Sequence, residues 1–132
     1  MTPLILVVDD EPQIQDLLEL MLKEKGYMTQ KCATGESAMK MMEEIEFNLV
    51  ILDLNLPGVN GFEVSEYIKE NHHNTPIVFI TGSQSAEAIS LENDCRSRCD
   101  MKLLYKPIDI QLLNSTLDTL IQNSLAKGKR SK

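Results

Sequence analysis

The stretch Leu4-Ile5-Leu6-Val7-Val8-Asp9-Asp10-Glu11 decides the fold of this chain of 132 residues. Five apolar residues without a polar interruption are typical of a strand that is buried on both faces of a parallel sheet. The same pattern returns at residues 49–52 and 77–80, and weaker strand candidates cover residues 27–32 and 101–105. The sequence therefore predicts five strands, of which the three strongest lie at the centre of a sheet.

Segments with the apolar spacing of amphipathic helices lie between these strands. We expect helices from Pro12 to just before Gly26 and at residues 37–46, 61–70, 85–94 and 109–125, the last with Asp109 as its N-cap. Strand and helix alternate five times, which predicts an α/β fold: a single domain with a doubly wound parallel sheet. Ligands of such sheets bind beyond the carboxyl ends of the strands.

The composition is that of a globular domain, with 42% hydrophobic and 25% charged residues. No apolar run is long enough to span a bilayer, and the first residues carry no basic segment of a secretory signal. The three cysteines are too few for a disulfide framework, which indicates a reducing compartment. We therefore expect a cytoplasmic location without membrane contact.

The charge is distributed unevenly along the chain. The net charge is −7, but residues 127–132 carry four of the 13 basic residues, so the rest holds nine bases against 20 acids. The acidic body argues against direct nucleic-acid binding by the folded part. We predict a domain at residues 1–125 and a basic tail, or the start of a linker, at residues 126–132.

Polar side chains follow four of the apolar runs where each run stops: Asp9 and Asp10, Asp53 with Asn55, Thr81 with Gly82, and Lys106 with Pro107. Each alone is more often a turn or cap residue, but together they occupy one rim of the predicted sheet. Crowded carboxylates need a cation, and Mg²⁺ prefers hard oxygen ligands. Aspartate can be a nucleophile toward phosphorus, while lysine and a hydroxyl stabilise phosphoryl oxygens. The sequence predicts a phosphoryl acceptor, Asp53, at a Mg²⁺ site completed by Asp9 and Asp10.

These motifs resemble those of bacterial response-regulator receiver domains, the CheY-like phosphoacceptors of two-component signalling. The most specific segments are residues 7–12, 52–62, 80–82 and 106–107, and the resemblance extends from Leu4 to about Leu125. It implies a flavodoxin-like (βα)5 domain with strand order 2-1-3-4-5.

The resemblance also implies a role for each acidic residue. Asp53 corresponds to the phosphorylated aspartate, Asp10 to a direct Mg²⁺ ligand, and Asp9 to a ligand that acts mostly through water. Asn55 is expected to supply its backbone carbonyl to the metal, for which Mn²⁺ could substitute.

Four residues correspond to the phosphoryl-binding side of the family's site. Thr81, with Gly82, matches the switch hydroxyl that moves toward the phosphoryl group, and Lys106 matches the lysine that pairs with a phosphoryl oxygen. A cis peptide is expected between Lys106 and Pro107.

The chain departs from the family pattern in three places, one of which is the segment ahead of the last strand, where the usual Gly-Ala is missing from residues 95–100. Asn60 stands where an aspartate is common, and Leu103 occupies the position of the usual switch aromatic, three residues before Lys106. Tyr105 immediately precedes the lysine, and we expect it on a different face of the strand from that aromatic. These changes leave phosphorylation intact and alter the expected path from Thr81 to the output surface.

The resemblance implies a signalling phosphoacceptor rather than an enzyme, one that assists its own phosphorylation and dephosphorylation. Its phosphodonor is expected to be a sensor histidine kinase or a histidine phosphotransfer protein, and the target an output domain or partner. Residues 85–94, 101–105 and 109–125 form a candidate surface for a homodimer. Two alternatives stay open: an interaction module that never takes phosphate, and a small Mg²⁺-dependent phosphatase. The second usually requires a carboxylate at the position of Asn55.

Overall fold

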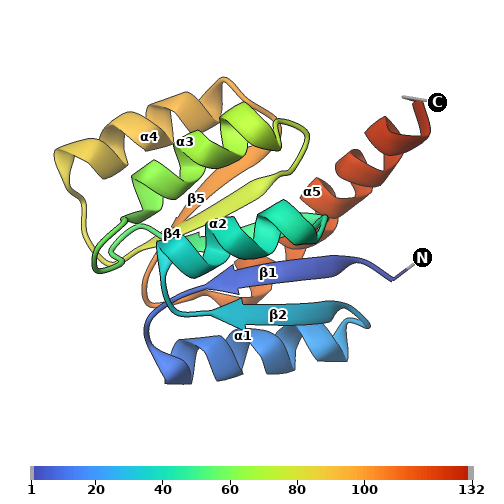
Figure 1. Cartoon of the computed structure of the whole chain (residues 1–132), viewed down its shortest axis with the longest axis horizontal. Helices are drawn as coiled ribbons and strands as arrows, with labels where there is room; N and C mark the ends of the chain where they lie inside the picture. The colour runs from blue at the N-terminus through green and yellow to red at the C-terminus, as the bar shows by residue number, and fades with distance from the viewer. Residues whose placement is uncertain (1, 131–132) are drawn as a thin grey trace.

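Strands and helices alternate along the whole of the computed structural model, which describes residues 2–130, with side chains up to residue 124 (Figure 1). The strands are β1 (Leu4–Val8), β2 (Met28–Cys32), β3 (Leu49–Asp53), β4 (Ile77–Thr81) and β5 (Met101–Tyr105). The helices are α1 (Pro12–Glu24), α2 (Gly35–Glu44), α3 (Gly61–Asn71), α4 (Ala86–Arg96) and α5 (Ile110–Arg130). All ten predicted elements are present.

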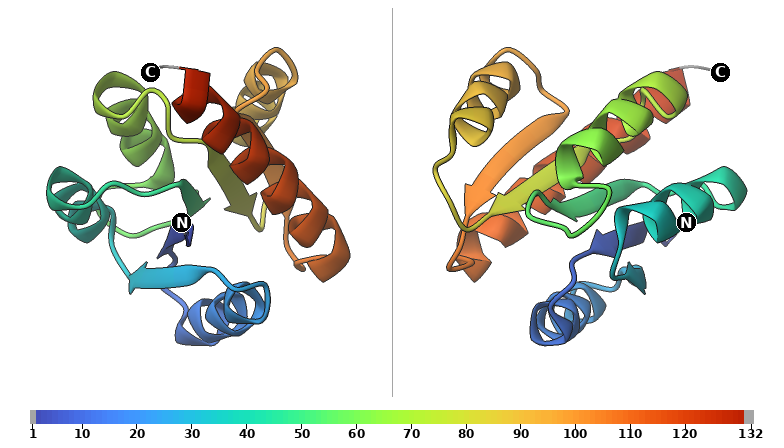
Figure 2. Two further views of the ribbon diagram at one scale, coloured as in Figure 1. Left: turned by 90° about the vertical axis from the view of Figure 1, so that its right-hand side faces the viewer. Right: turned by 60° about the vertical axis from the view of Figure 1, so that its left-hand side comes forward.

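The five strands form one parallel sheet in the order β2-β1-β3-β4-β5, as predicted. The left view of Figure 2 shows α2 and α3 on one side of the sheet and α5 on the other. Because every strand runs in the same direction, the carboxyl ends of all five lie along a single rim.

Two apolar cores flank the sheet, one on each face. Alternate residues of the central strands, such as Leu6 and Val50, pack against α2, α3 and α4. Their neighbours in the chain, such as Ile5 and Ile51, pack against α1 and α5. The continuous apolar runs in the sequence are therefore explained by burial of both faces of each central strand.

Polar side chains cap the helices, and one of these caps shows that the predicted start of α2 was wrong. Thr34 accepts a hydrogen bond from the backbone N–H of Ser37, so α2 begins at residue 35 rather than 37. Asn60, at the position where the family often has aspartate, caps α3 by accepting from the N–H of Glu63 at 3.0 Å. The predicted cap Asp109 is confirmed, since its Oδ1 accepts from the N–H of Leu112.

The last helix, α5, continues to Arg130, beyond its predicted end at about residue 125. The prediction followed the apolar spacing, which stops there, whereas alanine, lysine and arginine have high helix propensity and prolong a helix without an apolar face. The division into a domain of residues 1–125 and a tail of residues 126–132 stays a prediction. None of the helices in residues 2–130 combines the length and apolar character needed to span a membrane.

Strand β5 corrects one expectation. Leu103 packs against the core under α2, α3 and α4, and Tyr105 donates a hydrogen bond from its hydroxyl to Glu92 of α4 at 3.2 Å. Both side chains therefore point toward the α4 side of the sheet. The expectation of different faces was wrong, because residues two apart in a strand project on the same side.

Candidate functional site

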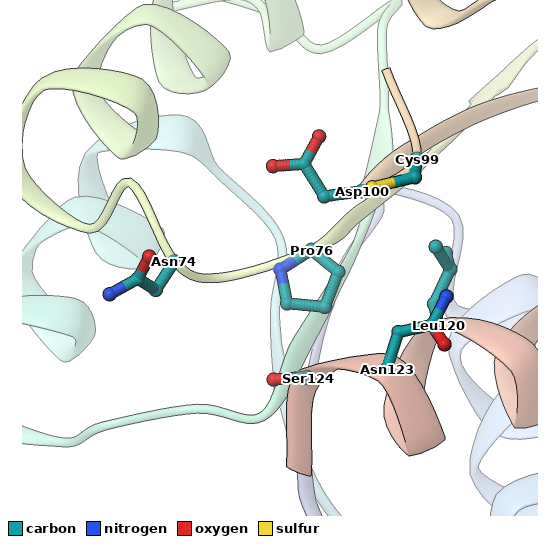
Figure 3. A pocket seen from close by; sticks show the side chains of 7 residues that line it. All are labelled: Asn74, Pro76, Cys99, Asp100, Leu120, Asn123 and Ser124. Atoms are coloured by element: carbon teal, nitrogen blue, oxygen red, sulfur yellow. The ribbon is translucent and has the colours of Figure 1, made fainter. Parts of the chain in front are cut away.

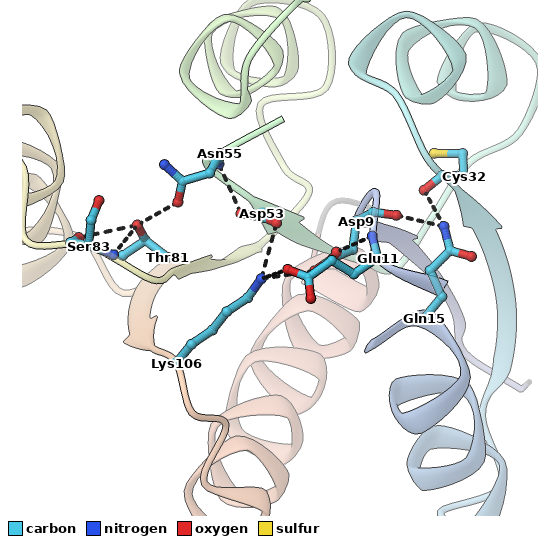
Figure 4. A network of polar contacts seen from close by, with 9 residues as sticks. All are labelled: Asp9, Glu11, Gln15, Cys32, Asp53, Asn55, Thr81, Ser83 and Lys106. Carbon is cyan, nitrogen blue, oxygen red and sulfur yellow. Dashed lines mark hydrogen bonds and ion pairs between the residues drawn. The ribbon is translucent and has the colours of Figure 1, made fainter. Parts of the chain in front are cut away.

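The ends of β1, β3, β4 and β5 bring the predicted polar residues to one rim of the sheet (Figure 4). Asp53 is the last residue of β3 and Thr81 the last of β4, while Asp9 and Lys106 directly follow β1 and β5. Asp9, Asp53 and Thr81 are almost completely buried, with 1–2% of their surface exposed. Residues from four separate segments thus form one polar site in an otherwise apolar setting.

Four carboxylates meet at this site: those of Asp9, Asp10, Glu11 and Asp53. Each offers an oxygen within 4.8 Å of the others, with Asp9 and Asp53 buried and the other two exposed. Burial raises the pKa of Asp9 from 3.8 to about 6, although a hydrogen bond from the N–H of Glu11 opposes this rise. The four carboxylates are hard oxygen donors, and burial destabilises the negative charge of Asp9. This combination suits a small divalent cation.

Lys106 is the cation of the site. Its Nζ lies 3.1 Å from Oε1 of Glu11, 3.3 Å from Oδ2 of Asp53 and 3.7 Å from Oδ2 of Asp9. Burial alone would lower the pKa of this lysine, but the three carboxylates together raise it above its usual value. Lys106 therefore stays protonated and can neutralise an anion beside Asp53.

Asp53 is held from two sides. Its Oδ1 accepts a hydrogen bond from the backbone N–H of Asn55 at 2.9 Å, while its Oδ2 faces Lys106. Behind it, Gly61 at the start of α3 approaches so closely that a Cβ atom there would lie 2.5 Å from the Asp53 carbonyl oxygen. The carboxylate thus has a fixed orientation, because both its strand and its side chain are restrained.

The hydroxyl of Thr81 belongs to a second small network. It donates to Oδ1 of Asn55 at 3.0 Å and approaches the carbonyl oxygen of Ser83 at 3.2 Å, and it accepts from the Ser83 N–H at 3.3 Å. Gly82 lies between Thr81 and Ser83 in the chain, and a Cβ atom there would be in ordinary contact with Cδ of Lys106, at 3.9 Å. In this arrangement Thr81 is directed at Asn55 rather than at Asp53.

The chain matches the response regulator receiver domain family over residues 5–118. It belongs to this family. VanR, a regulatory protein of Enterococcus faecium, is 39% identical over 85 residues, which cover 64% of this chain and 36% of VanR. The transcriptional regulatory protein AfsQ1 of Streptomyces coelicolor is 30% identical over 128 residues, covering 97% of this chain and 53% of AfsQ1. The chain thus spans about half or less of either relative.

A solved structure supports the same fold. The signal receiver domain of a LuxO-type repressor from Vibrio parahaemolyticus superimposes with a TM-score of 0.88, at 24% identity, over 100% of this chain and 99% of that one. Receiver domains bind Mg²⁺ at an acidic cluster and act with histidine kinases or phosphotransfer proteins. The acidic cluster of this receiver domain has the donors for such an ion.

The peptide between Lys106 and Pro107 is cis, as predicted. Two residues of the receiver domain's site were missed by the sequence analysis. Gln15 of α1 donates from Nε2 to the backbone carbonyls of Asp9, at 2.6 Å, and Cys32, at 3.1 Å, and thereby joins the ends of β1 and β2. Glu11 appeared only as part of a motif, without its contact to Lys106.

A small hollow lies at the opposite end of the sheet, where Pro76 and Asp100 precede β4 and β5 (Figure 3). Its volume of about 10 Å³ is close to the minimum for a single water molecule. The hollow is therefore too small for a cofactor.

Proposed function

We propose that this receiver domain accepts a phosphoryl group on Asp53 from a sensor histidine kinase or a histidine phosphotransfer protein. The observation that carries the proposal is the environment of the Asp53 carboxylate. It is 2% exposed, fixed at Oδ1 by an N–H and paired at Oδ2 with the Lys106 ammonium. A nucleophile held in one orientation beside a cation is what transfer to a carboxylate requires.

Asp9, Asp10 and Asp53, with the backbone carbonyl of Asn55, are the proposed ligands of Mg²⁺, for which Mn²⁺ could substitute. The set consists of hard oxygens, and the raised pKa of Asp9 marks a negative charge that its surroundings do not fully compensate. When bound, the ion would supply positive charge for the carboxylates and for the phosphoryl oxygens.

An Asp53 carboxylate oxygen attacks the phosphorus of the phosphohistidine. The new P–O bond forms as the P–N bond breaks, and the electron pair of that bond stays on the imidazole nitrogen, which takes a proton from water. Lys106 pairs with a phosphoryl oxygen, and the Thr81 hydroxyl exchanges its acceptor Asn55 for another phosphoryl oxygen. This exchange biases a pre-existing equilibrium between two conformations, which controls an output domain or partner.

The proposal treats the domain as a phosphoacceptor that assists its own phosphorylation and dephosphorylation rather than as a phosphatase. Asn55 occupies the position where a phosphatase of this kind needs a second carboxylate, and an amide cannot exchange a proton as a general acid or base. We further propose that the domain does not bind nucleic acid directly, and that α4, β5 and α5 form its surface for a homodimer.

The test is incubation with acetyl phosphate and Mg²⁺, followed by measurement of the intact mass of the protein. Wild type is expected to gain the mass of one phosphoryl group, and removal of Mg²⁺ with EDTA should abolish the gain. Asp53→Asn should remain unmodified, whereas Asp94→Asn, a matched change at an exposed aspartate of α4, should react as wild type does. An unmodified wild-type protein would favour the interaction module that never takes phosphate.

A further inference from the structure

The ammonium of Lys106 contacts the carboxylate of Glu11 in addition to the carboxylates of the buried Asp9 and Asp53. The contact to Glu11 Oε1, at 3.1 Å, is the shortest of its three carboxylate contacts. The Glu11 side chain is 58% exposed, whereas those of Asp9 and Asp53 are 2% exposed. Glu11 therefore lies at the open side of the site, where a phosphodonor must approach.

The local structure leaves the Glu11 carboxylate free to reach the lysine. Glu11 is the N-cap of α1, and its backbone N–H is bonded to Oδ1 of Asp9 at 2.8 Å. Its side chain makes no capping hydrogen bond to the helix, although many N-cap side chains do. The carboxylate instead crosses the rim to Lys106, which lies 95 residues away in the sequence.

We infer that Glu11 occupies the position on Lys106 that a phosphoryl oxygen must take, and that this competition slows phosphoryl transfer to Asp53. The inference rests on the function proposed above. Two effects act together: Lys106 must exchange Glu11 for the incoming group, and the exposed negative charge repels an anionic donor. Glu11 is thus a positioning residue that acts through Lys106.

The decisive variant is Glu11→Gln, which keeps the size of the side chain and removes its charge. With acetyl phosphate, a small anion, we expect phosphorylation about fivefold faster than in wild type at low salt, which corresponds to about 1 kcal/mol. The gain should shrink in about 1 M salt, where the Debye length is about 3 Å. A faster reaction that responds to ionic strength is not the result of general damage to the fold.

Glu19→Gln is the matched control. Glu19 is a partly exposed acid on the same helix that pairs with Lys31 at 2.9 Å and is not one of the four carboxylates of the acidic cluster. The substitution also removes one negative charge and one lysine contact. Its phosphorylation rate is expected to equal that of wild type at both salt concentrations.

A second measurement uses the metal-free protein and needs no phosphorylation. The side-chain ammonium signal of Lys106 in NMR spectra should shift, and its hydrogens should exchange faster with water, in Glu11→Gln but not in Glu19→Gln. Direct titration with Mg²⁺ then separates competition for Lys106 from metal binding, because a metal ligand would lose affinity strongly when its charge is removed.

Each outcome has a defined meaning. If the wild type accepts a phosphoryl group and Glu11→Gln is phosphorylated at the same rate, this inference is overturned, while the proposed function stands. A slower rate with a tenfold or greater loss of Mg²⁺ affinity would assign Glu11 to the metal and would also overturn it. A wild-type protein that takes no phosphoryl group would refute the proposed function and, with it, the inference.

Discussion

Gly61 is the point at which the first turn of α3 touches the strand that carries Asp53, so Gly61→Ala tests how tightly the site is built. An added Cβ would lie 2.5 Å from the Asp53 carbonyl oxygen and 2.6 Å from Cα of Leu54, both backbone atoms. Real Cβ contacts stay above 3.0 Å, so the helix and the strand must separate by about 0.5 Å. Such overpacking costs about 1–3 kcal/mol, and alanine returns about 0.5–1 kcal/mol through its helix propensity. These ranges combine to a net loss between about 0 and 2.5 kcal/mol in the free energy of unfolding; because both clashing atoms belong to the backbone and cannot move aside cheaply, we expect about 1–2 kcal/mol.

Urea unfolding followed by far-ultraviolet circular dichroism measures this loss. Gly82→Ala is the control, because a Cβ there would meet nothing closer than Cδ of Lys106 at 3.9 Å, and its stability should stay within about 0.5 kcal/mol of wild type. The displaced Asp53 backbone should also slow phosphorylation in Gly61→Ala by about tenfold or more. If Gly61→Ala is as stable as wild type, the backbone yields without cost and the close approach does not restrain Asp53.

Two further predictions concern charge and hydrogen bonding around the rim. Burial raises the pKa of Asp9 in the folded protein from 3.8 to about 6. In the metal-free protein, ionisation of Asp9 therefore destabilises the fold increasingly as the pH rises from about 3.8 to about 6, and by a constant amount above pH 6. After allowance for solvent screening, Asp9→Asn should therefore stabilise the metal-free protein by about 1–2 kcal/mol at pH 7.5, but not near pH 3.5. Urea unfolding at the two pH values measures this difference. An equal gain in stability at both pH values would contradict the prediction. Tyr105→Phe removes the hydrogen bond to Glu92 and should cost about 0.5–1 kcal/mol while leaving the phosphorylation rate unchanged; a marked fall in that rate would show that the hydroxyl also acts at the acidic rim.

The sequence alone was sufficient to predict the sheet and the location of the site. Strands that are buried on both faces consist of continuous apolar residues, as in residues 4–8 and 49–52. Such runs can be recognised in the sequence without knowledge of the tertiary structure. In a parallel sheet, the residues that end such runs must share a rim, which is how Asp53, Thr81 and Lys106 were predicted to be neighbours. The structure brings these three together, while their roles in phosphoryl transfer remain proposals.

Other features depended on contacts that no local pattern reveals. Gln15 binds the ends of β1 and β2 through one amide, and a glutamine in the first turns of a helix is otherwise an ordinary exposed residue. The contact of Glu11 with Lys106 depends on which way a flexible side chain turns. The direction of Tyr105, by contrast, could have been predicted, because the two-residue period of a strand places it on the same side as Leu103.

The direction of the Tyr105 side chain provides a path of contacts from Thr81 to α4. Thr81 and Tyr105 are paired in the register of β4 and β5, and the backbone N–H of Lys106 donates to the Thr81 carbonyl at 2.8 Å. Residues paired across parallel strands project to the same face, so the Tyr105 ring lies on the same side of the sheet as the Thr81 side chain, and its hydroxyl reaches Glu92 of α4. Leu103 is two residues further from the rim and packs in the core, where displacement would open a cavity. We therefore expect a rearrangement of Thr81 to reach α4 through Tyr105 rather than through Leu103.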